Sequence, residues 1–120
     1  MRKSQLKTFS TERLVEEFRK LSAEHGHASS ARAANRKYDA LVAIRRELRS
    51  RGTEAQRLLL KLLADPEPST RYFTASSVLQ FAPSEAEQVL KELSRTQRNT
   101  IGVEADWTLK QWREGTFNPP

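Results

Sequence analysis

Apolar residues recur at intervals of three and four along most of the chain, and short polar or proline-containing segments separate the runs. This spacing places apolar side chains on one side of an α-helix. The run before residue 65 is an example, with apolar residues at Ala55, Leu58, Leu59, Leu62 and Leu63. Helical spacing of this kind throughout the chain predicts an all-α protein.

Prolines set the ends of the central helices. The segment Asp65-Pro66-Glu67-Pro68 ends the run at 55–63, because proline lacks an N–H group and disfavours the α conformation in the residue before it. Pro68 suits the first position of the next helix, where a missing N–H costs nothing. Pro83 then closes that helix.

Capping signals mark the other helix ends. We expect a serine cap at Ser10, a left-handed terminator at Gly26 and another at Gly115. Capping boxes are expected at residues 53–56 and 84–87, where a hydroxyl residue is followed three positions later by Gln or Glu. The helices that follow cover about residues 11–26, 29–50, 53–64, 68–82, 84–94 and 101–114.

The longest predicted helix, over residues 29–50, has an apolar and a charged side. Its apolar positions are Ala34, Tyr38, Leu41, Val42, Ile44 and Leu48. Arg45 is an exception, because at about 100° per residue it points close to the centre of the apolar side. A buried guanidinium must be paired and hydrogen-bonded. We therefore predict a structural role for Arg45, with a carboxylate or a helix-terminus carbonyl as its partner.

The stretch LLADPEPSTRYFTASSVL resembles a HEAT-type α-hairpin repeat. That pattern has an aspartate and a proline in the turn, an arginine in the first turn of the second helix, then a small residue and a leucine. Asp65, Arg71, Ala75 and Leu79 fill these positions. The resemblance implies structural roles for Asp65 in the turn and for Arg71, which would bridge the turn carboxylates Asp65 or Glu67.

The second half of the chain repeats this pattern at an offset of 30 residues. The matched pairs are Leu63 and Leu93, Phe73 and Val103, Ala75 and Ala105, and Leu79 and Leu109. The second copy has RTQRNT in place of the Asp-Pro turn and the arginine, so it is degenerate. Repeats of this size are typical of solenoids. We predict a short right-handed α-α superhelix of the HEAT/ARM kind, with about six helices in three antiparallel hairpins.

This superhelix is expected to form a single domain over residues 10–115. A flexible N-terminal arm, 1–9, precedes it, and a tail, 116–120, follows it. The run from EEFRKL to KQWREG, taken as a whole, resembles a bacterial family catalogued as domain of unknown function number two thousand and nineteen. That resemblance implies a fold and no activity.

Composition narrows the class of protein further. The absence of cysteine excludes disulfides and thiol catalysis. No apolar run approaches the roughly 20 residues that span a membrane, and no secretory signal is visible. We therefore expect a cytoplasmic protein that has no membrane partner.

The sequence offers no set of residues for catalysis. It contains no serine nucleophile elbow, glycine-rich phosphate loop or nucleotide fingerprint, so we expect neither enzyme activity nor a cofactor. His25 and His27 could form a metal pair with Glu24, but they flank a glycine and lack the i, i+4 spacing of helical zinc sites. We expect no metal site there, and interpret His25 as a residue at the boundary of the apolar stripe.

The net charge of +6 resides in the first 50 residues, which hold 12 Lys/Arg and 6 Asp/Glu, whereas residues 51–120 hold nine of each. The candidate anion or nucleic-acid surface consists of Arg32, Arg36, Lys37, Arg46, Arg49 and Arg51. A protein that binds nucleic acid would neutralise the phosphates with such a row of basic side chains. The same basic residues could also form a solvated helix face that binds nothing. An acidic protein is the alternative partner to nucleic acid.

Val103 and Trp107 point away from the predicted core and are the candidate partner surface. Phe117 and the final prolines of the tail could cover them instead. We predict a non-enzymatic helical-repeat scaffold that binds another protein, with nucleic-acid or acidic-ligand binding through the helix at 29–50 as the alternative.

Overall fold

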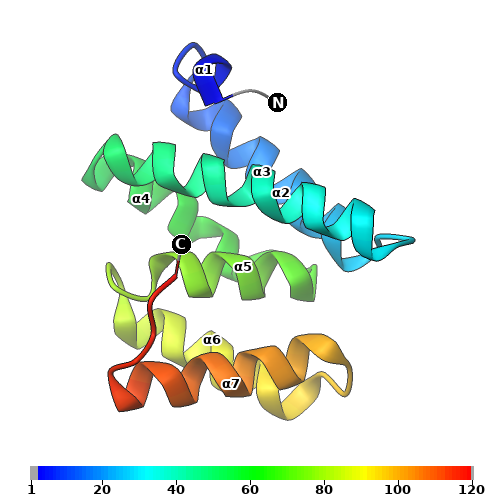
Figure 1. Ribbon diagram of the computed structural model, residues 1–120. Helices are drawn as coiled ribbons and strands as arrows, with labels where there is room; N and C mark the ends of the chain where they lie inside the picture. Colours follow the sequence, from blue (N-terminus) through cyan, green and yellow to red (C-terminus); the bar gives the residue numbers. More distant parts are fainter. Residues whose placement is uncertain (1–2, 120) are drawn as a thin grey trace. The chain divides into compact units, whose positions relative to one another are not determined.

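Helices account for all the regular secondary structure in residues 3–119, the part of the chain that the computed structural model describes (Figure 1). Six of them have eight or more residues: α2 (Thr11–Gly26), α3 (Ala31–Ser50), α4 (Thr53–Leu60), α5 (Pro68–Val78), α6 (Pro83–Thr96) and α7 (Thr100–Glu114). The short helix α1 (Lys3–Leu6) precedes them, and a 3₁₀ turn (Lys61–Ala64) follows α4. The predicted all-α class is confirmed.

Among the described residues, 3–61 form one unit and 62–119 form another. In the N-terminal unit, α2 and α3 pack as an antiparallel pair, and α4 contacts both of them (Figure 1). Leu14 and Phe18 of α2 and Ile44 and Leu48 of α3 are fully buried. These positions are the apolar stripes that the sequence predicted.

In the C-terminal unit, α6 and α7 form a second antiparallel pair, and α5 packs against both (Figure 1). Its buried residues include Leu90 and Leu93 of α6 and Ala105 and Leu109 of α7. Gly102, in the first turn of α7, lies so close to the end of α6 that a Cβ atom there would overlap the carbonyl oxygen of Gln97. The tight approach of these two helices therefore depends on a residue without a side chain.

Several helix ends confirm the sequence prediction. Ser10 accepts a hydrogen bond from the backbone N–H of Arg13 at 3.1 Å. Ser30, for which no cap was predicted, accepts one from the backbone N–H of Ala33 at the same distance. Pro68 is the first residue of α5. Gly115 ends α7 in the left-handed conformation, with a φ of 75°.

Other predicted helix ends were wrong. Gly26 does not have a positive φ and is the last residue of α2. The capping boxes at 53–56 and 84–87 do not form, since neither α4 nor α6 has a side-chain cap. Gly52, with a φ of 93°, takes the cap position of α4, and Pro83 begins α6 because its fixed φ suits the first turn. Thr53 and Ser84 consequently lie inside the helices.

The segment expected to be a flexible arm contains α1, and the Leu6 side chain is only 2% exposed. The flexibility of the arm stays a prediction. In the tail, the backbone N–H groups of Thr116 and Phe117 donate to the carbonyl of Gln111, which turns the chain back toward α7. No helix in residues 3–119 is both long and apolar enough to span a membrane.

Candidate functional site

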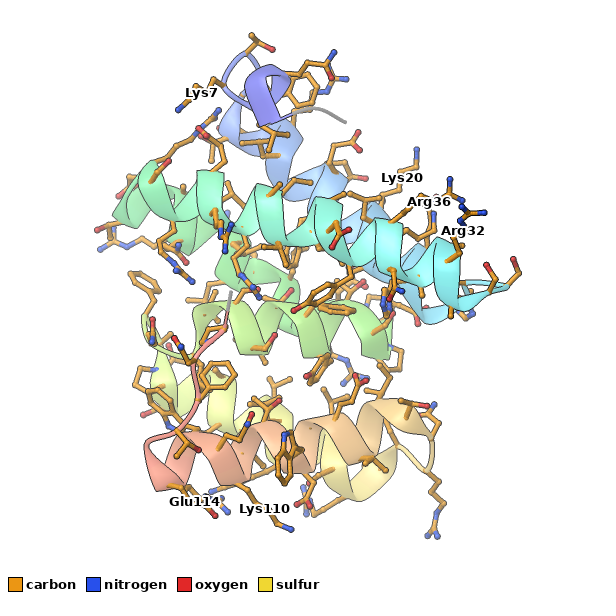
Figure 2. All side chains as sticks on the ribbon, viewed as in Figure 1. Lys7, Lys20, Arg32, Arg36, Lys110 and Glu114 are labelled. Carbon is orange, nitrogen blue, oxygen red and sulfur yellow. The ribbon has the colours of Figure 1, made fainter. Side chains whose placement is uncertain are left out.

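The six basic residues predicted as an anion surface divide into two groups. Lys37 and Arg51 are partly buried and form ion pairs, whereas Arg32, Arg36, Arg46 and Arg49 are exposed. None of these four arginines forms an ion pair with any side chain that the structure describes. Arg32 and Arg36 project from α3 in the same direction as Lys20 of α2 (Figure 2). Four of the six predicted residues therefore remain available to an anion.

Arg51 joins three parts of the N-terminal unit. Its Nε donates to Glu47 at 2.9 Å, one Nη donates to the Thr11 hydroxyl at 3.2 Å, and the other Nη donates to the Leu6 carbonyl at 2.9 Å. Lys7 also approaches Glu47, at 3.7 Å. These bonds connect the end of α3 to the start of α2 and to α1. Arg51 thus acts as a structural residue.

Arg45 is buried, as predicted, with 5% of its surface exposed. Burial is the main reason that its pKa is lowered, and the nearby cations Arg49 and Arg46 lower it further. The Tyr38 side chain opposes this shift through a hydrogen bond and its charge interaction with the guanidinium. The Tyr38 phenol is therefore one group that favours the charged form, and the predicted carboxylate or carbonyl partner stays a prediction.

The turn before α5 is held by Asp65, whose Oδ1 accepts a hydrogen bond from the backbone N–H of Glu67 at 3.0 Å. The predicted bridge from Arg71 to Asp65 or Glu67 was wrong. Arg71 pairs instead with Glu92 of α6, at 3.1 Å. It therefore connects α5 to α6, a contact between helices that the repeat pattern could not specify.

The outward face of α7 carries the two most exposed large apolar residues in the described chain, Val103 at 71% and Trp107 at 60%. They lie one helical turn apart, so their side chains are neighbours on the surface. The tail does not cover Trp107 through Phe117, because the Phe117 ring packs edge-on against Trp112, with 6.4 Å between ring centroids. Among the described residues 3–119, the predicted partner surface of Val103 and Trp107 therefore remains exposed.

Polar side chains lie beside Trp107 on one side of α7. The Tyr72 and Thr108 hydroxyls are 3.1 Å apart and connect α5 to α7. Glu104, one turn before Thr108, is partly buried, and burial raises the pKa of its carboxyl. Sequence analysis missed Glu104 because a lone glutamate in a helix gives no sign of its burial.

On the other side of α7, a groove of about 440 Å³ lies between α7 and α6. Lys91 and Arg95 of α6 and Arg113 of α7 line it, together with Leu109, which is 3% exposed. Asp106 also lines the groove and pairs with Lys110, at 3.5 Å. Lys110 and Glu114 point outward from α7 (Figure 2). Sequence analysis missed this groove, because the predicted helix ended at residue 94, whereas α6 continues to Thr96 and includes Arg95.

His25 lies partly buried at the end of α2, beside the Lys37–Glu24 ion pair of 3.3 Å. Burial lowers the pKa of His25, and the charge of Lys37 lowers it further. Within residues 3–119, no three His, Asp or Glu side chains come together in the way metal ligands do. The neutral form of His25 is thus favoured at the boundary of the core.

Comparison with known proteins adds a family and a solved relative. No curated protein matches the chain. The crystal structure of the protein RPA1889 from Rhodopseudomonas palustris CGA009 is similar, with 26% sequence identity, a TM-score of 0.86, and coverage of 93% of this chain and 95% of that one. A family model described as "Domain of unknown function (DUF2019)" matches residues 12–112. The match covers most of the chain and agrees with the resemblance predicted from the sequence, and the chain therefore belongs to the DUF2019 family.

Proposed function

We propose that this protein is a non-enzymatic, HEAT-like helical scaffold that binds another protein through the outward face of α7. The observation that carries the proposal is the exposure of Trp107 and Val103 as adjacent apolar residues on one helix. Tryptophan is enriched among the residues that contribute most to protein–protein binding, because its large ring is favourable to bury. A partner that covers both side chains would remove this apolar surface from water.

The HEAT-like part of the proposal has support in residues that match between the two repeats. Ala75 and Ala105 are both fully buried, as the small-residue position requires, and Leu79 and Leu109 are buried as well. Phe73 is buried, but its counterpart Val103 is exposed. In a solenoid each repeat is covered by a neighbour. Val103 thus occupies a position that is suited to a covering partner.

The test is an affinity capture from lysate of the source organism, followed by mass spectrometry. We expect a protein that the wild-type chain recovers to be lost when Trp107 is changed to alanine. Phe81→Ala is the matched control, because Phe81 is also an exposed aromatic residue, at 41%, but follows α5 and lies outside α7. Equal recovery by the wild type and both variants would remove the α7 face from the proposal.

The alternative function, binding of nucleic acid or another acidic ligand through α3, has one specific observation in its favour. Arg32, Arg36 and Arg46 lie on one side of α3, and all are exposed and form no ion pair with the side chains that the structure describes. Asp39 lies on the same side and offsets part of their charge. Such a row could neutralise phosphates, although the exposed aromatic Trp107, which could stack on single-stranded bases, belongs to α7.

A further inference from the structure

The groove between α6 and α7 concentrates positive charge in a unit that is otherwise acidic. Residues 62–120 contain six Lys/Arg and eight Asp/Glu. Three of the six cations, Lys91, Arg95 and Arg113, line the groove, and all three are exposed. The other side chains that the structure describes do not form ion pairs with them. By contrast, the Arg71 side chain of the same unit is neutralised by Glu92.

Around α7, the groove residue Arg113 lies about 120° from Trp107, and Lys110 and Asp106 lie between them. Following the circumference of α7 at about 100° per residue, Trp107 is followed by Lys110, Asp106, Arg113 and then Leu109. The Asp106 carboxylate is occupied by Lys110, so it opposes an incoming anion less than an isolated carboxylate would. An extended ligand could therefore contact Trp107 and the three free cations together.

We propose that the α6–α7 groove binds an acidic segment of a partner protein, with carboxylates on Lys91, Arg95 and Arg113 and an apolar side chain against Trp107. This inference rests on the proposed function and specifies the chemistry of the partner. Charge complementarity identifies the occupant: the groove has a surplus of cations, and arginine forms bidentate pairs with carboxylates. The exposed Trp107 supplies apolar surface, which a peptide with a hydrophobic residue would cover.

The test uses the full chain and a fluorescein-labelled oligoglutamate peptide with one central leucine, followed by fluorescence polarisation at low salt. The triple variant Lys91→Gln/Arg95→Gln/Arg113→Gln should weaken binding about tenfold, the loss expected for three exposed ion pairs. The matched control is Arg32→Gln/Arg36→Gln/Arg46→Gln, which removes the same charge from α3. It should alter binding by much less, because Arg32, Arg36 and Arg46 do not line the groove.

Further controls separate the groove from general effects of charge and folding. The Arg95→Lys/Arg113→Lys variant keeps the charge but not the bidentate pairs, so it should bind more weakly than the wild type and more tightly than the groove triple variant. A glutamine version of the peptide should not bind. Circular dichroism should show equal helix content in all variants, because every changed side chain is exposed. A similar loss from both triple variants would reveal an effect of net charge and overturn the proposal. Absence of peptide binding at low salt would overturn it as well.

Two outcomes distinguish this inference from the proposed function. If Trp107→Ala abolishes capture of a partner but the groove triple variant does not, the α7 face binds a protein and the groove proposal is wrong. If neither change affects capture, both are wrong. Single-stranded DNA that binds more tightly than the peptide, and that the groove triple variant releases, would assign the groove to phosphates instead.

Discussion

At the scale of single residues, helix geometry placed side chains relative to the core more reliably than it identified their partners. Arg45 was predicted to be buried because its position along α3 fixes its direction, and it is buried. Its interaction with Tyr38 lies within the same helix, but a phenol was not the expected partner. Arg71 pairs with Glu92, 21 residues away, and no local pattern specifies that pair.

Glu104 should make the stability of the protein depend on pH. Burial raises its carboxyl pKa above the ordinary value of 4.5, so the folded state holds this proton more tightly than the unfolded chain does. The Glu104 contribution to stability therefore falls as pH rises above 4.5 through the raised value. We expect Glu104→Gln to have a higher free energy of unfolding than the wild type at pH 7. The difference should shrink as the pH is lowered toward 4.5.

Urea unfolding of both proteins across this pH range measures the difference. Glu114→Gln controls for the change in net charge, because it removes one carboxylate from the exposed end of the same helix. A lower stability of Glu104→Gln at pH 7 would mean that the Glu104 carboxylate has a favourable interaction in the folded protein that outweighs its burial.

At the scale of helices, the sequence predicted which segments are helical, and most errors concern their ends. Periodicity and prolines indicated all six longer helices, because apolar spacing reports the buried side directly. The caps at Thr53 and Ser84 were wrong because Gly52 and Pro83, the residues before them, offer backbone conformations that start the helix at least as well. The docking of α1 could not be predicted, since it depends on Arg51, 45 residues from Leu6.

Gly102 should be among the least replaceable residues of the C-terminal unit. A Cβ atom at this position would overlap the Gln97 carbonyl, and backbone cannot move aside as a flexible side chain can. We expect Gly102→Ala to lower the free energy of unfolding by about 1–3 kcal/mol or more. Gly26→Ala is the control, because Gly26 has an ordinary helical backbone and is exposed. That change should be stabilising, by about 0.5–1 kcal/mol. Equal effects at the two positions would contradict the close approach of α6 and α7.

Arg51 should hold α1 against the rest of the N-terminal unit. Arg51→Gln removes its bonds to Glu47 and the Leu6 carbonyl, so we expect a loss of about 1–2 kcal/mol in the free energy of unfolding. Hydrogen exchange of the amides in residues 3–9 should accelerate as well, because α1 loses this attachment. Arg32→Gln, an exposed arginine of the same helix that forms no ion pair with the described side chains, should change neither quantity appreciably. Unchanged exchange in Arg51→Gln would show that Leu6 alone docks the segment.

At the scale of the whole molecule, charge separates the two units. Residues 1–61 hold 15 Lys/Arg and seven Asp/Glu, whereas residues 62–120 have a small excess of acidic residues. Counting along the sequence shows that the charge is uneven, whereas the boundary at residue 61 comes from the structure. The sequence did not reveal the α6–α7 groove, since Lys91, Arg95 and Arg113 come together only when the two helices pack. A surface built from several elements is the kind of feature that local patterns miss.

This division predicts how the protein should respond to nucleic acid. Random duplex DNA should associate with the basic N-terminal unit at low salt through Arg32, Arg36 and Arg46, whichever function the protein has. Three phosphate contacts give a slope of about −3 in a plot of log K against log salt concentration, so binding should become weak near physiological salt. Arg36→Gln should make the slope shallower by about 1, and the groove triple variant should leave it unchanged. Binding that persists at physiological salt and discriminates between DNA sequences would instead favour nucleic acid as the partner, because simple neutralisation by three arginines supplies neither property.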